Sequence, residues 1–264
     1  LSPDAQGLII PEAVTQALRE DTFLVSLMLV NNELGTLNDV QAIGERVRRH
    51  GALLHVDAAQ GAGKLPIDLA QWPVDLMSFS AHKVYGPKGI GALYVGKRAA
   101  PLLKAQIHGG GHENGLRSGT LATHQIAAMG AAFALAGQVL EQELVRMHYL
   151  RKRLLDQLAE IPGLSLNGSP VQRIPHTLSL TFAGDGIDLK ALASSLAFSS
   201  TSACNSASSA PSHVLLALGH DERAARQTLR LSLGRYTHEG EIDKAAHAIK
   251  AALHSVPFWA VAHG

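Results

Sequence analysis

Short apolar runs alternate with amphipathic stretches through the first half of the chain. The apolar runs predict buried strands at residues 23–30, 52–56, 74–79 and 90–95. A helix that starts with proline is predicted before the first strand, over 11–20. A second, between the first two strands, is capped by Asn38, with Gln41 completing a capping box and Gly51 ending the helix. Continuous apolar strands separated by helices are typical of an α/β domain whose sheet is mostly parallel and covered on both faces.

The pattern changes in the second half. A glycine-rich loop at 106–119 precedes a long predicted helix at 123–160, rich first in alanine and leucine and then in charged residues. We place a domain boundary in this helix, so that residues 1–138 belong to a large domain and residues 139–264 to a smaller α+β domain. For the smaller domain the pattern predicts strands at 177–182 and 229–233 and helices at 188–197, 212–218 and 239–254.

Polar residues gather where the predicted strands of the first half end. The residues at these positions are Asn31, Asn32, Asp57, Ser80, His82 and Lys83. Ligands of open parallel sheets bind beyond the carboxyl ends of the strands. The sequence therefore predicts a binding site at this edge of the sheet.

Lys83 stands directly after a buried strand, in the sequence Ser80-Ala81-His82-Lys83. A desolvated lysine amine is a nucleophile toward carbonyl groups, and pyridoxal phosphate is its usual carbonyl partner. Ser80 and His82 are then candidates to bind the phosphate, and Asp57 to hold a cationic ring nitrogen in its protonated form. The alternatives are a solvated surface lysine, a hydrogen-bonded turn histidine and an aspartate that caps a helix or turn.

Two further candidates lie in the second half. Cys204 stands in a run of serine, threonine and alanine at 198–210, typical of a surface loop, where an exposed thiol suits sulfur chemistry. Otherwise a lone cysteine is a small buried hydrophobe. Arg230 lies inside an apolar strand, and its partner is either a substrate carboxylate, an internal ion pair or solvent. The glycines 109–111 form either a phosphate-binding nest or a hinge.

Composition excludes several classes of protein. The chain has 264 residues and a formal net charge of +1, which gives no indication of a nucleic-acid partner or a polybasic membrane surface. No apolar run is long enough to span a bilayer, and no histidine or cysteine spacing indicates a metal site. Cys204 is the single cysteine, which fits a reducing compartment, so we expect a cytoplasmic protein.

Six segments together resemble the cysteine desulfurases of the class V aminotransferase type, in that family's order and over nearly the whole chain. They are HVDAAQ (55–60), SFSAHKVYGPKG (78–89), HGGGHE (108–113), RSGT (117–120), SSTSAC (199–204) and LRLSLGR (229–235). The long cysteine-bearing loop is similar to the NifS/IscS branch. The resemblance implies a pyridoxal-phosphate-dependent fold type I large domain with a mostly parallel sheet, followed by a smaller α+β C-terminal domain.

The resemblance also implies a role for each matching residue. Lys83 holds pyridoxal 5'-phosphate through a Schiff base, with His82 beside it in the catalytic group. The other cofactor contacts are Asp57 at the ring nitrogen, Gln60 and Asn32 near the phenolic oxygen, Ser80 and His82 at the phosphate, and Thr120 at the phosphate of a neighbouring subunit in a homodimer. Arg230 and Asn32 bind the carboxylate of L-cysteine. Cys204 accepts the sulfur as a persulfide and passes it to an iron–sulfur scaffold protein, or another acceptor, for cluster assembly or tRNA thiolation.

The family also carries an N-terminal segment ahead of the position that matches Leu1. We therefore expect this chain to be a fragment, a split gene product or a truncated form. Two alternatives to desulfuration follow. One is a catalytically silent homologue that serves as a binding or dimerisation partner. The other is a related pyridoxal-phosphate enzyme, such as a selenocysteine lyase or an aminotransferase.

Overall fold

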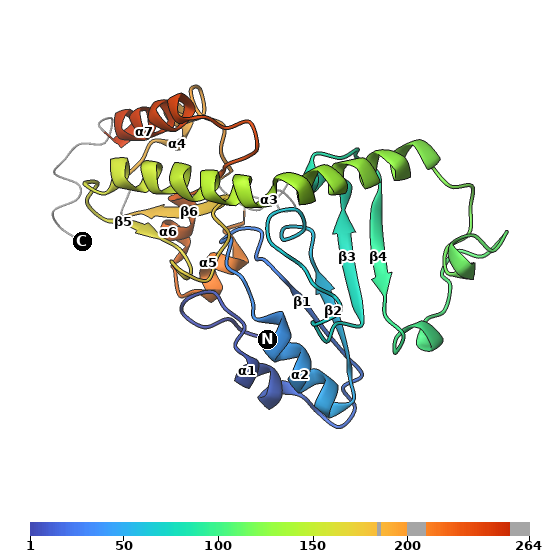
Figure 1. Ribbon diagram of the computed structural model, residues 1–264. Helices are drawn as coiled ribbons and strands as arrows, with labels where there is room; N and C mark the ends of the chain where they lie inside the picture. Colours follow the sequence, from blue (N-terminus) through green and yellow to red (C-terminus); the bar gives the residue numbers. More distant parts are fainter. Residues whose placement is uncertain (184–185, 200–209, 254–264) are drawn as a thin grey trace. The chain divides into compact units, whose positions relative to one another are not determined.

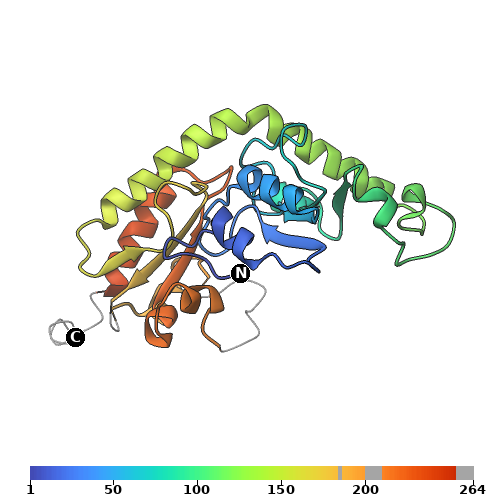
Figure 2. The same ribbon diagram turned by 90° about the horizontal axis from the view of Figure 1, so that it is seen from below.

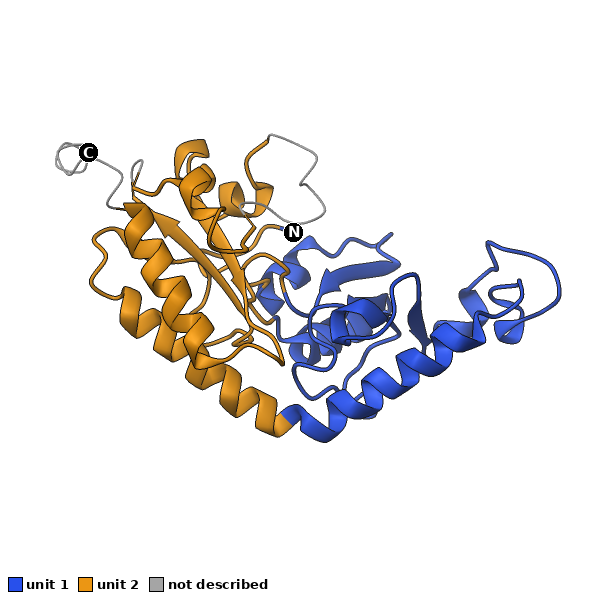
Figure 3. Cartoon of the chain, turned by 90° about the horizontal axis from the view of Figure 1, so that it is seen from above, with its two compact units in different colours: residues 1, 10–30, 38–140 blue, residues 2–9, 31–37, 141–264 orange. Residues whose placement is uncertain are grey.

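The computed structural model describes residues 1–183, 186–199 and 210–253, which fall into two compact units. Unit 1 comprises residues 1, 10–30 and 38–140, and unit 2 comprises residues 2–9, 31–37 and 141–264 (Figure 3). The helix α3 (Thr123–Leu158) passes from unit 1 into unit 2. The sequence pattern places the boundary in this helix but does not reveal that Ser2–Ile9 and Asn31–Leu37 join the C-terminal half of the chain.

Unit 1 is built on a four-stranded sheet in the order β1-β2-β3-β4 (Figure 1). Its strands are β1 (Leu24–Met28), β2 (Leu53–Asp57), β3 (Leu76–Ser80) and β4 (Gly91–Val95). The first three strands run parallel and β4 runs antiparallel to β3. The predicted mostly parallel sheet is thus confirmed.

Two α-helices flank the first strands, α1 (Pro11–Ala17) and α2 (Val40–His50). The predicted cap of α2 is wrong by one residue, because the side chain of Asp39 accepts the hydrogen bond from Ala42 N, at 2.9 Å, while Asn38 Nδ2 donates to Met28 O. Gly51 ends the helix in the left-handed region with φ 96°, as predicted. Three short 3-10 turns complete the unit, η1 (Ala81–Val84), η2 (Ala100–Leu102) and η3 (Glu113–Gly115).

At β1, one face of this sheet is exposed among the described residues. Along β1, Val25 and Leu27 are buried, whereas Leu24, Ser26 and Met28 are exposed. The prediction that both faces are covered is therefore wrong for the part of the chain that the structure describes. Within that part, no helix is long and apolar enough to cross a membrane.

Unit 2 contains an antiparallel sheet in the order β5-β6-β7 (Figure 2). The strands are β5 (Leu164–Leu166), β6 (Thr177–Phe182) and β7 (Thr228–Ser232), and the helices besides α3 are α4 (Leu189–Leu192), α5 (His213–Ala217), α6 (Glu222–Arg226) and α7 (Glu239–Leu253). The second half of α3 and α7 bury apolar side chains against Leu178, Leu180 and Phe182 of β6. Because α4 ends at Leu192, the helix predicted to 197 is too long.

A polar ladder crosses the three parallel strands of unit 1. His55 of β2 hydrogen-bonds Ser26 Oγ of β1 through Nδ1, at 2.8 Å, and Ser78 Oγ of β3 through Nε2, at 2.6 Å. Burial lowers the pKa of His55 below its ordinary value of 6.5, and the Asp57 carboxylate opposes this effect. The neutral imidazole, with one donor and one acceptor nitrogen, therefore satisfies both serines.

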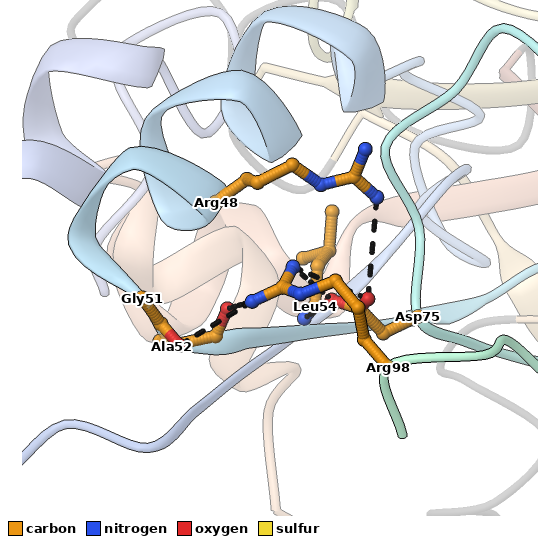
Figure 4. A network of polar contacts seen from close by, with 6 residues as sticks. All are labelled: Arg48, Gly51, Ala52, Leu54, Asp75 and Arg98. Carbon is orange, nitrogen blue, oxygen red and sulfur yellow. Dashed lines mark hydrogen bonds and ion pairs between the residues drawn. The ribbon is translucent and has the colours of Figure 1, made fainter. Parts of the chain in front are cut away.

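The buried carboxylate of Asp75 links neighbouring elements at the amino ends of β2 and β3 (Figure 4). Asp75 is 2% exposed, and its Oδ2 accepts from Leu54 N at 2.9 Å and from Arg98 Nη1 at 3.2 Å. Arg48, in the last turn of α2, adds a longer ion pair at 4.0 Å. Arg98 also donates to the carbonyls of Gly51 and Ala52. Asp75 thereby joins the end of α2, the start of β2 and the segment after β4.

We expect Asp75→Ala to lower the free energy of unfolding by about 3 kcal/mol, since it leaves Leu54 N–H buried without an acceptor and removes the charge facing Arg98. Asp75→Asn should cost less, because an amide oxygen still accepts from Leu54. Urea denaturation followed by circular dichroism measures both. Asp21→Ala is the control, since its pair with Arg19 is exposed and should contribute less than about 1 kcal/mol. Equal losses for Asp75→Ala and Asp21→Ala would contradict this assignment.

His55 should make folding sensitive to mild acid. Because its pKa is lower in the folded chain than in the unfolded chain, protons bind preferentially to the unfolded chain as pH falls below about 6.5, and stability decreases there. His55→Gln retains a donor and an acceptor without a titrating proton, so its stability should change less between pH 7 and pH 5.5. His124→Gln, on the exposed start of α3, should keep the wild-type slope. A slope that survives in His55→Gln would assign the effect to another group.

Candidate active site

The carboxyl ends of β2 and β3 bring the predicted chemical groups of unit 1 to one edge of the sheet. Asp57 is the last residue of β2 and pairs with Ser78, two residues before the end of β3 at Ser80. The backbone bonds continue beyond the strand, since Ala58 N donates to Ser78 O at 3.0 Å. The turn η1 follows β3 directly and carries His82 and Lys83. The predicted edge site is thus where the topology places these residues.

The turn η1 directs its two basic residues away from the core. Ala81 and Val84 are buried, while His82 is exposed and Lys83 is half-buried. Ser80 Oγ and His82 Nδ1 are hydrogen-bonded at 2.9 Å. The turn closes where Gly86 N donates to Ala81 O, and a Cβ at Gly86 would lie 2.9 Å from that same oxygen. Only glycine therefore fits at 86, which fixes the point where the chain leaves the site.

Asp57 has little to satisfy its charge. Its Oδ1 accepts from Ala59 N at 2.9 Å, which is a local turn contact, and no ion pair among the described residues includes it. A half-buried carboxylate in this state favours a cationic ligand group. The alternative that Asp57 caps a turn is correct for Oδ1. Its Oδ2 remains available for a ligand.

Gln60 lies one turn beyond Asp57 and has a partner that the sequence did not suggest. Lys64 Nζ donates to Gln60 Oε1 at 3.0 Å. Burial, followed by the charge of Lys83, lowers the pKa of Lys64 to about 8. Lys64 is therefore near the site although it was not predicted there. No sequence pattern indicates this contact, because residues 59–64 form turns and not a helix.

Unit 2 holds a second group of polar residues. Arg230 of β7 donates through Nη1 to Asn32 O at 3.2 Å and through Nη2 to Ser199 Oγ at 3.1 Å. Arg230 and Ser199 also exchange two backbone hydrogen bonds. No carboxylate pairs with Arg230 among the described residues, so the internal ion pair, one of the alternatives left open by the sequence, is not found there. A half-buried guanidinium with only neutral acceptors suits an anionic ligand.

The buried carboxylate of Glu33 holds the start of α5 within unit 2. Ser212, the N-cap of α5, donates to Glu33 Oε2 at 2.5 Å, and both residues are at most 5% exposed. Asn31 Oδ1 accepts from the backbone of Glu33 and Leu34, which shapes the turn that carries Asn32. The carbonyl of Asn32 therefore faces Arg230 from a fixed turn.

Two further predicted residues are Thr120 and Cys204. Thr120 is exposed at the end of the glycine-rich loop, which is closed by Ser118 N donating to Ile107 O at 3.1 Å. Cys204 lies outside the described residues. The described residues contain no cluster of three or more histidine, cysteine, aspartate or glutamate side chains that could hold a metal ion.

Known proteins resemble this chain over almost all of its length. The model of the aminotransferase class-V family matches residues 1–245. The cysteine desulfurase IscS of Pseudomonas entomophila (strain L48) is 52% identical over 264 residues, which cover 98% of this chain and 65% of that protein. The chain thus spans about 65% of the length of the curated relatives that it matches.

Solved structures agree with this similarity. A NifS-like protein superposes with a TM-score of 0.84 at 34% identity, over 97% of this chain and 68% of the other. SspA, in complex with cysteine, superposes with a TM-score of 0.72 at 39% identity, over 90% of this chain and 66% of the other. With the family match extending over residues 1–245, the chain belongs to the class-V aminotransferase family.

Proposed function

We propose that this chain forms the part of a pyridoxal-phosphate-dependent cysteine desulfurase that binds cofactor and substrate and carries the sulfur-accepting cysteine. The observation that carries the proposal is the position of Lys83 in the turn after β3, with Asp57 at the end of the neighbouring parallel strand. The similarity to IscS supports the choice of reaction. The complex of SspA with cysteine supports L-cysteine as the substrate.

The groups at the edge of the unit 1 sheet fit pyridoxal phosphate. An amine suits the aldehyde, a carboxylate without an ion pair suits the pyridinium nitrogen, and a hydroxyl next to an imidazole suits the phosphate. Lys83, Asp57, Ser80 and His82 provide these groups in that order. Gln60 supplies an amide for the phenolic oxygen. When bound, the cofactor supplies a carbonyl that takes up amines and a ring that accepts electrons from the substrate α-carbon.

The other steps are assigned to side chains of this chain. Lys83 would hold the cofactor through its amine, and the same amine, when free, would take the proton from the substrate α-carbon. Asp57 holds the proton on the ring nitrogen. Arg230 binds the substrate carboxylate in place of its neutral acceptor Ser199, and Asn32 supports it. These contacts orient the substrate before any bond is broken.

Cys204 is proposed as the sulfur acceptor. Its thiolate attacks the sulfur of L-cysteine, an S–S bond forms as the C–S bond breaks, and the electron pair of that C–S bond remains with the carbon that becomes the alanine methyl group after protonation. The persulfide then passes to an acceptor such as an iron–sulfur scaffold protein. We also propose a cytoplasmic homodimer in which Thr120 reaches the phosphate of the neighbouring subunit, as the exposure of Thr120 allows.

Lys83→Ala and Cys204→Ser test the proposal at two separate steps. With added pyridoxal phosphate, the unmodified chain should form a yellow species that borohydride fixes covalently, and Lys83→Ala should not, because the amine is absent. Cys204→Ser should keep the yellow species but lose alanine formation from cysteine. Mass spectrometry and an alanine assay measure the two outcomes. Normal alanine formation by Cys204→Ser, or faster turnover of selenocysteine than of cysteine, would contradict the proposed reaction.

Arg230→Met should weaken substrate binding about 10- to 100-fold, since it removes charge-assisted hydrogen bonds to the carboxylate. The cofactor should still bind, because the groups proposed to hold it lie in unit 1. A titration of the cofactor spectrum with L-cysteine measures substrate affinity separately from turnover. Arg226→Met is the control, since that side chain is half exposed and pairs with Glu222 on α6. Unchanged cysteine affinity in Arg230→Met would assign the carboxylate to another residue.

A further inference from the structure

Lys64 is held against Gln60 by the turn that follows β2. Ala62 N donates to Ala58 O at 2.8 Å and Lys64 N to Gly61 O at 3.0 Å, so the backbone of 58–64 forms consecutive hydrogen-bonded turns. These turns bring the side chain of Lys64 back to that of Gln60. Lys64 Nζ donates to Gln60 Oε1 at 3.0 Å.

Close packing brings this turn beside η1. Gly63 has a φ of +71°, and a Cβ there would lie 2.8 Å from Val84 Cγ1, so the backbone at 63 rests directly on Val84. Gly61 is packed in the same way, with a Cβ position 2.6 Å from Leu29 Cδ2. Val84 follows Lys83 in η1, and the charge of Lys83 contributes to lowering the pKa of Lys64. Lys64 therefore belongs to the surroundings of Lys83 and is not a freely solvated lysine.

Lys64 has no carboxylate to explain its position. None of the ion pairs formed within the described part of the chain includes it, although burial and the charge of Lys83 both lower the pKa of its amine to about 8. A lysine kept in such surroundings usually has a function other than solubility. Its one described side-chain partner is the amide oxygen of Gln60.

The chemistry of this contact fixes the amide of Gln60. An ammonium group only donates hydrogen bonds, so the amide oxygen faces Lys64 and the Nε2 donors are turned elsewhere. We propose that Lys64 is a positioning residue, which orients Gln60 so that its Nε2 donates to the phenolic oxygen of pyridoxal phosphate. This inference rests on the proposed function for the identity of the acceptor, but the orientation of Gln60 is a property of the chain itself.

The orientation is tested in the chain without cofactor by NMR of the Gln60 side-chain amide. As Lys64 loses its proton, the Gln60 NH2 signals should shift with a midpoint near pH 8. Lys64→Met should abolish this shift, while Lys97→Met, an exposed lysine of the same unit, should leave it unchanged. A titration that persists in Lys64→Met, or its absence from the unmodified chain, overturns the proposal.

The link to the cofactor is tested by a double-mutant cycle on equilibrium binding of pyridoxal phosphate. Lys64→Met and Gln60→Ala should each weaken binding about 5-fold, and the double variant should be no weaker than Gln60→Ala alone, because Lys64 acts through Gln60. Lys64→Arg should restore most of the affinity, since arginine also donates to the amide oxygen. Additive losses overturn the proposal. If the unmodified chain binds no pyridoxal phosphate, the proposed function fails, and the NMR titration still decides the orientation of Gln60.

Discussion

Backbone pairing that continues past the ends of the parallel strands is the constraint on which the candidate site depends. Leu29 N donates to Asp57 O at 2.8 Å, and Ala58 N donates to Ser78 O at 3.0 Å, so the last residue of β2 is held from both sides. A carboxylate on a strand end would otherwise move with its loop. Because the backbone of Asp57 is fixed, its side chain and the turn that carries Lys83 are positioned by the sheet itself.

The polar groups of the chain fall into two kinds according to how far they are satisfied. Asp75 and His55 have protein partners for both of their polar atoms, and they hold neighbouring elements together. Asp57 and Arg230 have a charge but only neutral partners among the described residues. Since leaving a half-buried charge without a counter-charge is costly, such groups are expected where a ligand completes them.

The sequence predicted the parts of the fold that have strong periodic or apolar signals. The strands of unit 1 and the residues at their ends follow from continuous apolar runs and from the rule for parallel sheets. The strand β5 and the helix α6 were missed, because such short elements carry no readable period. Asp39 caps α2 in place of Asn38, because the side chain of Asn38 donates to Met28 O at the end of β1. Local sequence does not reveal this tertiary contact.

The charged residues of the candidate site can be picked out from the sequence, but the side-chain contacts around them cannot. Lys83, Asp57 and Arg230 attract notice as charged residues next to apolar strands. Lys64 and Ser199 do not, since their roles come from contacts made only in the folded chain. The sequence likewise did not reveal that Asn31–Leu37 belongs to unit 2, because this depends on packing between segments far apart in the sequence.

The contact between Gly63 and Val84 has a consequence for how this sequence can vary. A side chain at 63 would need both a left-handed backbone and a smaller neighbour at 84, so position 63 cannot gain a side chain unless position 84 becomes smaller. Val84 adjoins Lys83, and a shift there would move the amine of Lys83. Among related sequences, these two positions are therefore expected to covary, with substitutions arising in compensating pairs.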